Sequence, residues 1–101
     1  MFNCADSAWH KIQSYATAFM ERAEAADKNE LLAAIEIMRS KIGTKKPYEF
    51  SELAENSKSI TKAFWNPTVA AYCFCREDQR HVVATTITQT LDRLKVWLKK
   101  E

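Results

Sequence analysis

Apolar residues recur every three or four positions along the first half of the chain, which is the spacing of one face of an α-helix. Asp6 or Ser7 is expected to cap a first helix that runs to Ala26. Asp27 and Glu30 form a variant capping box, and Gly43 is expected to end the second helix that they begin. The two predicted buried faces consist of Trp9, Ile12, Ala16, Phe19, Met20 and Ala23, and of Leu31, Leu32, Ile35, Met38 and Ile42.

The stretch from Phe50 to Trp65 admits two interpretations. As one helix, it places Phe50, Leu53, Ser57, Ile60 and Phe64 on a single face. As two short helices, residues 51–55 and 57–65, it resembles a helix-turn-helix whose second helix would read DNA. Under both interpretations Asn66-Pro67 is expected to end the helix, since a residue before proline avoids the helical region and proline suits the first position of a new helix. Trp65-Asn66-Pro67 is therefore predicted to be a corner.

Helical periodicity returns in the last third of the chain. Val69 to Cys75 are expected to continue as helix, whereas residues 76–80 contain no apolar position and predict an exposed segment or a break. A final helix is predicted from about Asp78 to Lys99. A strand is the main alternative there, because the segment carries four threonines, which are poor helix formers. The apolar positions of the predicted final helix are Val83, Ile87, Leu91, Leu94 and Leu98.

These patterns predict an all-α fold, a compact bundle of four to five helices in a single helical domain over residues 1–101. The composition agrees, because one Gly and two Pro leave few places to turn, and 47% hydrophobic residues suffice for a core. The linker Thr44 to Tyr48 is polar and contains Pro47, so it is expected to be a surface loop. No stretch approaches the roughly 18 apolar residues of a membrane span, and no membrane partner is expected.

Cys4, Cys73 and Cys75 cannot all pair with one another, and no signal peptide precedes them. They predict free thiols packed in the core of a cytoplasmic protein, in a reducing compartment. A zinc site on Cys73, Cys75 and His81 is disfavoured, because residues two apart on a helix point to nearly opposite sides. No serine, cysteine or histidine lies in a hydrolase motif. We therefore expect no enzyme activity, no cofactor and no metal.

The net charge of +2 is too small to indicate nucleic-acid binding by itself, so any charge argument must be local. Lys58 and Lys62, together with Lys45 and Lys46, form the one basic cluster with an aromatic residue, Trp65, beside it. An exposed tryptophan at a proline corner is a typical anchor for a protein partner. The predicted partner-binding residues are Lys58, Lys62, Trp65, Asn66 and Pro67. DNA contact through the same helix is the alternative.

Residues 57–64, Ser-Lys-Ser-Ile-Thr-Lys-Ala-Phe, resemble the Ser-Ile-Thr-Arg-Ala-Phe segment of the phage lambda Gam family, inhibitors of the host RecBCD nuclease. A fainter likeness continues through Val69, Glu77, Arg80, Val83, Thr85 and Asp92 into a long final helix. Gam proteins are strongly acidic and imitate DNA, whereas this chain is slightly basic. The resemblance implies a small phage protein that binds RecBCD in another mode.

We therefore expect a non-enzymatic, phage-type protein in the host cytoplasm that inhibits or modulates a host protein complex, with RecBCD as the favoured partner. The alternatives are a small helix-turn-helix-like DNA-binding regulator and a helical adaptor within a larger assembly. Salt separates the first two, because binding to phosphates weakens steeply with ionic strength.

Overall fold

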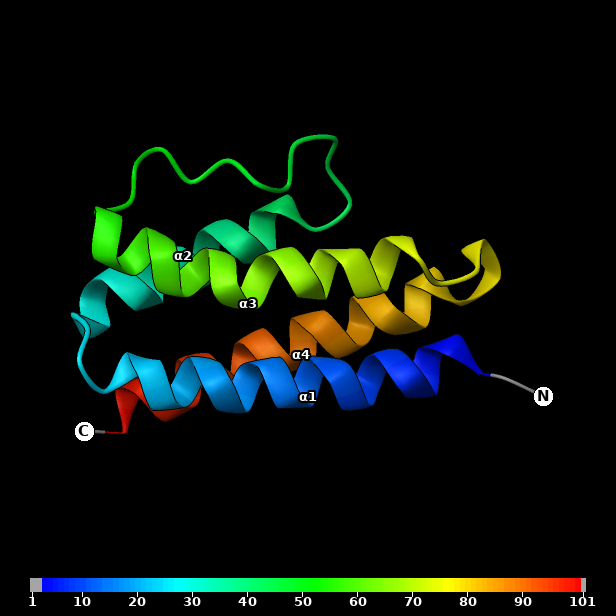
Figure 1. Ribbon diagram of the computed structural model, residues 1–101, viewed down its shortest axis with the longest axis horizontal. Coiled ribbons are helices and arrows are strands. Elements are labelled where there is room, and N and C mark those ends of the chain that lie inside the picture. The colour runs from blue at the N-terminus through cyan, green and yellow to red at the C-terminus, as the bar shows by residue number, and fades with distance from the viewer. Residues whose placement is uncertain (1–2, 101) are drawn as a thin grey trace.

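Four α-helices account for most of the chain in the computed structural model, which describes residues 3–100 (Figure 1). They are α1 (Cys4–Ala23), α2 (Lys28–Lys41), α3 (Glu55–Cys73) and α4 (Arg80–Lys99), and a short 3₁₀ turn, η1 (Glu77–Gln79), precedes α4. No strand occurs among the described residues. The predicted all-α bundle is confirmed, and the threonine-rich segment is helix. Within residues 3–100 no helix is both long and apolar enough to cross a bilayer.

The helices form a bundle in which α1 and α2 each pack against both α3 and α4. Figure 1 shows that α2 runs back along the bundle after α1, and that the loop of residues 42–54 then returns to the end where α2 began. As a result α3 runs parallel to α2 and antiparallel to α1. This crossover places α1 beside α3, although the two helices are far apart in the sequence.

The first two helices differ from the prediction mainly at their ends. Asn3, rather than Asp6 or Ser7, caps α1, and α1 ends at Ala23. Asp27 caps α2 as predicted, and its side chain accepts hydrogen bonds from the N–H groups of Asn29 and Glu30. The Glu30 carboxylate does not reach back to its own helix end. It accepts a hydrogen bond of 2.5 Å from the Ser57 hydroxyl, which ties α2 to α3.

The core lies between the four inward helix faces and contains most of the predicted apolar positions. All five positions predicted for the final helix are buried, and so are the α2 residues Leu31, Ile35 and Met38. Trp9 differs, because 45% of its surface is exposed although it was expected on the buried face of the first helix. The largest fully buried side chains are Trp65, Phe19, Phe50, Phe64, Ile12, Leu31, Ile35 and Met38.

Both interpretations of the stretch from Phe50 to Trp65 were wrong about where helix begins. Phe50 and Leu53 are buried, as the one-helix interpretation required, but they lie in the loop, where the Leu53 N–H donates to the Phe50 carbonyl. Residues 51–54 are not helical, so the first helix of a helix-turn-helix is absent from the structure. Both side chains instead pack from the crossover loop into the hydrophobic core of the bundle.

The predicted corner at Trp65-Asn66-Pro67 is also wrong, since Pro67 lies inside the continuous helix α3 and the peptide bonds of the described residues are all trans. Proline removes one backbone N–H, which in a regular helix would bond to the carbonyl of Ala63. Ala63 is exposed, so water can solvate that carbonyl. Buried residues on both sides of the proline, Trp65 and Thr68, hold the helix in the core, and this packing outweighs the local preference for a break.

Candidate functional site

The structure separates the five residues predicted to bind a partner. Trp65 is fully buried, and its indole N–H donates a hydrogen bond of 2.5 Å to the carbonyl of Pro47 in the crossover loop. The exposed tryptophan anchor was therefore a wrong prediction. The physical reason is that α3 continues past Trp65, which keeps this side chain on the inward face of the helix instead of at a corner.

Lys58, Lys62 and Asn66 follow one another at intervals of four along α3 and so share one side of the helix. Lys62 and Asn66 are exposed, whereas Lys58 is partly covered and its ammonium lies 2.8 Å from the Glu55 carboxylate. The hydrogen bond from Lys58, together with its charge, lowers the pKa of the Glu55 carboxyl below its ordinary value. Lys58 is thus engaged within its own helix, and Lys62 and Asn66 are the two members of this ridge that face solvent freely.

Pro67 lies on another side of α3 and lines a surface groove against α1. The larger part of this groove has a volume of about 350 Å³. Its α1 wall includes Ser7, Ala8, Lys11 and Tyr15, and its α3 wall comprises Pro67, Ala70, Ala71 and Phe74. Phe74 is the most exposed large apolar residue described, at 90%.

A smaller hollow of about 70 Å³ continues the groove along the same two helices, beginning at Tyr15, which lines both parts. It lies between Ala18 and Arg22 of α1 and Ile60 and Ala63 of α3. We call the two parts together the α1–α3 groove. It thus extends along nearly the whole length of α1, and small or apolar side chains form most of its floor.

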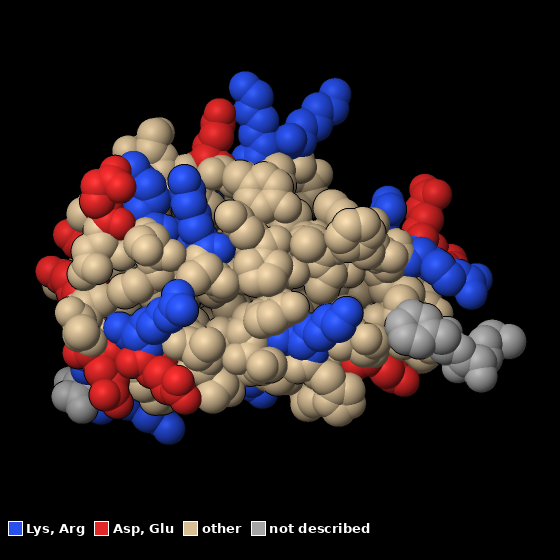
Figure 2. Space-filling model, viewed as in Figure 1, with Lys and Arg blue, Asp and Glu red and all other residues tan. Residues whose placement is uncertain are grey.

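Basic and acidic residues are nearly balanced on the two helices that form the α1–α3 groove, with Lys11, Arg22, Lys58 and Lys62 against three acidic residues. Glu55 is the single acidic residue of α3, and the acidic residues of α1 are Asp6 and Glu21. In Figure 2 the face formed by α1 and α3 is largely uncharged, with separate blue side chains across it and red ones toward its edges. Lys11 and Arg22 line the groove itself. A charged ligand of the groove itself is therefore expected to be acidic.

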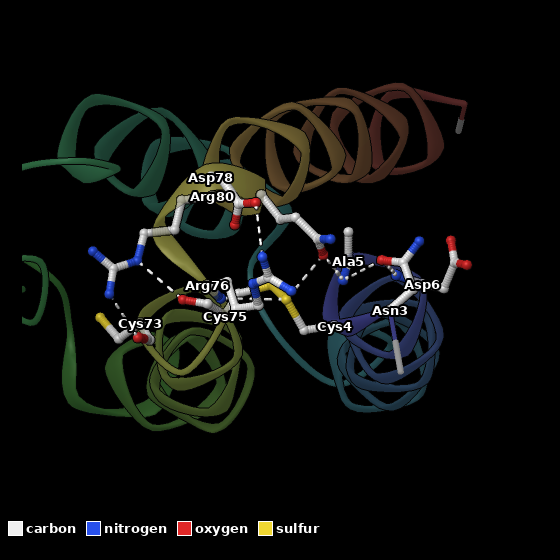
Figure 3. Close-up of a disulfide and its surroundings, with 10 residues drawn as sticks. Asn3, Cys4, Ala5, Asp6, Cys73, Cys75, Arg76, Asp78 and Arg80 are labelled. Carbon is white, nitrogen blue, oxygen red and sulfur yellow. Dashed lines mark hydrogen bonds and ion pairs between the residues drawn. A yellow bond between two sulfur atoms is a disulfide. The ribbon is translucent and has the colours of Figure 1, made fainter. Parts of the chain in front are cut away.

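One end of the groove is closed by a disulfide between Cys4 of α1 and Cys75, which follows α3 (Figure 3). The Ala5 N–H donates to the side-chain oxygen of Gln79 at 3.1 Å, and the Arg80 guanidinium donates to the carbonyls of Cys73 and Cys75.

The prediction of three free thiols in the core is wrong, because Cys4 and Cys75 form a disulfide and Cys73 is exposed. The fold brings together two cysteines that are 71 positions apart in the sequence, and no local sequence pattern predicts that they meet. Cytoplasmic location stays a prediction, and the disulfide weighs against a reducing compartment.

The described residues contain no group of three or more His, Cys, Asp or Glu side chains placed to hold a metal ion. Ser57 and Glu30 form a hydrogen-bonded pair that resembles a nucleophile with a base, but Ser57 is fully buried and a substrate cannot reach it. Their hydrogen bond instead joins two helices. Among the surface hollows of the described residues, the α1–α3 groove combines apolar walls with two basic side chains.

Sequence reasoning missed most of the groove. Alanines such as Ala70 and Ala71 carry little amphipathic signal, and the partner helix α1 is recognisable only once the topology is known. The exposure of Phe74 could have been predicted from the sequence. Phe74 lies nine residues after Trp65, which puts the two residues on opposite sides of a helix, so a helix that buries Trp65 exposes Phe74.

Comparisons of the chain with protein-family models, with curated proteins and with solved structures gave no match. The site must therefore be interpreted from its own chemistry.

Proposed function

We propose that this protein is a non-enzymatic binding module that inhibits or redirects a host protein complex, with RecBCD as the favoured target. The α1–α3 groove carries this proposal. It combines small and apolar lining residues, the exposed aromatic side chain of Phe74 and two basic lining residues, Lys11 and Arg22. Exposed aromatic residues beside a groove are typical of protein-binding surfaces, where they contribute much of the binding energy.

RecBCD is favoured because of the resemblance to the Gam family alone, and the structure limits what that resemblance supports. Three residues of the similar segment, Ser57, Thr61 and Phe64, are buried in this bundle. A likeness at buried positions supports a similar helix and not a similar contact surface. The two charged residues that line the groove, Lys11 and Arg22, are both basic, which also argues against imitation of DNA. A contact on the protein surface of the complex, in a mode of its own, fits both observations.

The test uses purified RecBCD and linear duplex DNA, with ATP-dependent digestion measured at increasing concentrations of this protein. We expect slower or altered digestion, together with co-elution of the protein and the complex in size-exclusion chromatography. The control is digestion by a nuclease unrelated to RecBCD, whose rate should not change. Unchanged digestion and no co-elution at micromolar protein would refute RecBCD as the target.

DNA binding is the second candidate function, since Lys11, Arg22, Lys58 and Lys62 lie on the two helices of one face. The helix-turn-helix that prompted it is not formed, and Ser57 of the supposed reading helix is buried. Binding of duplex DNA that persists in low salt and is lost at roughly 0.5 M salt would favour this function. A protein contact anchored on apolar residues would weaken much less over the same range.

A further inference from the structure

The α1–α3 groove has the length and floor of a site for one α-helix. From Cys4 to Arg22 its α1 wall rises by ~27 Å, the length of about 18 helical residues. Its floor carries alanines from both walls, among them Ala8, Ala63 and Ala70. Small side chains let a third helix approach closely, as helix-in-groove recognition requires. Tyr15 in the middle and Phe74 at one end offer larger apolar contacts.

The charges of the groove define the flanks of that helix. Lys11 lines its larger part and Arg22 its smaller part, and neither forms an ion pair with an acidic side chain in the described part of the chain. Lys62 of α3 lies outside the groove, and its charge acts on Glu55. Complementary charge on a ligand would therefore be negative on the side of its apolar stripe that faces α1.

We propose that the α1–α3 groove binds a single amphipathic helix of a partner protein, with its apolar stripe on the alanine floor and acidic residues on the flank that faces α1. This inference rests on the proposed function and specifies the kind of partner segment that the module would take. Nucleic acid fits the groove less well, because a phosphate backbone gains nothing from an alanine floor and only Lys11 and Arg22 line it as cations.

The test uses synthetic peptides as probes. One is a helix of about 18 residues with leucines along one face and glutamates on both flanks, and the second replaces every glutamate with lysine. A fluorescently labelled DNA duplex of similar length is the third probe. Binding to the intact protein is measured by fluorescence anisotropy at low salt and again at roughly 0.5 M salt. We expect the acidic peptide to bind at least about tenfold more tightly than its lysine counterpart.

Two variants locate the binding site. Ala70→Trp fills the larger part of the groove and should weaken binding of the acidic peptide at least about tenfold, while Ala33→Trp, at an exposed position of α2, should leave its affinity within about twofold. Lys11→Glu should weaken it by a similar factor, and Lys99→Glu, at an exposed position of α4, should not. Circular dichroism confirms that each variant is folded. If Ala70→Trp fails to fold, the pair Lys11→Glu and Lys99→Glu still decides the matter.

Several outcomes would overturn the proposal: equal affinity for the two peptides, no response to the groove variants, or preferential binding of the DNA duplex that is lost in high salt. The RecBCD assay separates the two levels of inference. If wild type and Ala70→Trp inhibit RecBCD equally, the proposed function holds and docking in the groove is wrong. If the acidic peptide binds in the groove but RecBCD digestion does not respond, the groove proposal holds and the target is another protein.

Discussion

Trp65 lies in the middle of α3, where the crossover loop packs against the helix, and it contributes both packing and a hydrogen bond there. Its side chain is fully buried and its indole N–H bonds to the Pro47 carbonyl. Trp65→Ala should lower the free energy of unfolding by about 4 kcal/mol, because it leaves a large cavity. Trp65→Phe keeps most of the volume and should cost less. Urea denaturation followed by circular dichroism measures both.

Trp9 supplies the matched control for Trp65, since it is also a helical tryptophan but is 45% exposed. Trp9→Ala should change stability by less than about 1 kcal/mol. Equal losses for Trp9→Ala and Trp65→Ala would show that Trp65 is not in the core, and the corner interpretation of the sequence would then return.

Thr61 carries a buried hydroxyl that has no hydrogen-bond partner among the described residues. A buried polar group without a partner destabilises the folded state, so Thr61→Val should raise the free energy of unfolding by up to about 1 kcal/mol. Thr90 is the matched control, because its hydroxyl oxygen accepts a hydrogen bond from the Gln13 amide at 3.1 Å. Thr90→Val should cost about 1 kcal/mol. Destabilisation by both substitutions in urea denaturation would contradict the unpaired state of Thr61.

At the scale of elements, the continuation of α3 past Pro67 without a break is the feature that is tested most directly. A proline inside a helix destabilises the folded protein by about 3 kcal/mol relative to alanine. Its rigidity also lowers the conformational entropy of the unfolded chain, which stabilises the folded protein by about 1 kcal/mol. Pro67→Ala should therefore stabilise the protein by about 2 kcal/mol in urea denaturation. Were residues 65–67 a corner, the same substitution would remove a favourable helix start and lower stability instead.

The helices that were predicted correctly are those in which apolar spacing persists over many residues. In α4 five apolar positions agree with the helical period, and their burial outweighs the poor propensity of Thr86 and Thr90, which are themselves buried. Phe50 and Leu53 have the same spacing of three but lie in a loop. Two positions three apart occur in a turn as readily as in a helix, so the beginning of α3 was not predictable from them.

The α1–α3 groove was beyond sequence reasoning for a different reason. The crossover of residues 42–54 decides which helix lies beside α1, and the length of this loop does not predict which helix that is. Lys62 and Pro67 were both predicted as binding residues, and Pro67 does line the groove, but only because the helix continues past it. The residue types that define a surface were thus visible in the sequence, whereas the surface itself depends on helix pairing.

At the scale of the whole molecule, the disulfide between Cys4 and Cys75 joins the beginning of α1 to the turn before α4. A crosslink over 71 positions restricts the unfolded chain and contributes about 4 kcal/mol by chain entropy. Cys4→Ser should lower the free energy of unfolding by about that amount in urea without reductant. Cys73→Ser is the control, because Cys73 is an exposed free thiol, and it should change stability by less than about 0.5 kcal/mol.

Reduction of the wild-type protein should reproduce the loss caused by Cys4→Ser, and reductant should have no effect on the Cys4→Ser variant itself. Mass spectrometry after alkylation of the denatured protein checks the state of the bond directly, since only Cys73 should react when no reductant is present. Alkylation of all three cysteines in protein isolated under conditions that prevent thiol exchange would show that the bond is absent in the cell. The reducing compartment predicted from the sequence would then hold, and the end of the groove formed by Cys4 and Cys75 would be held by helix packing alone.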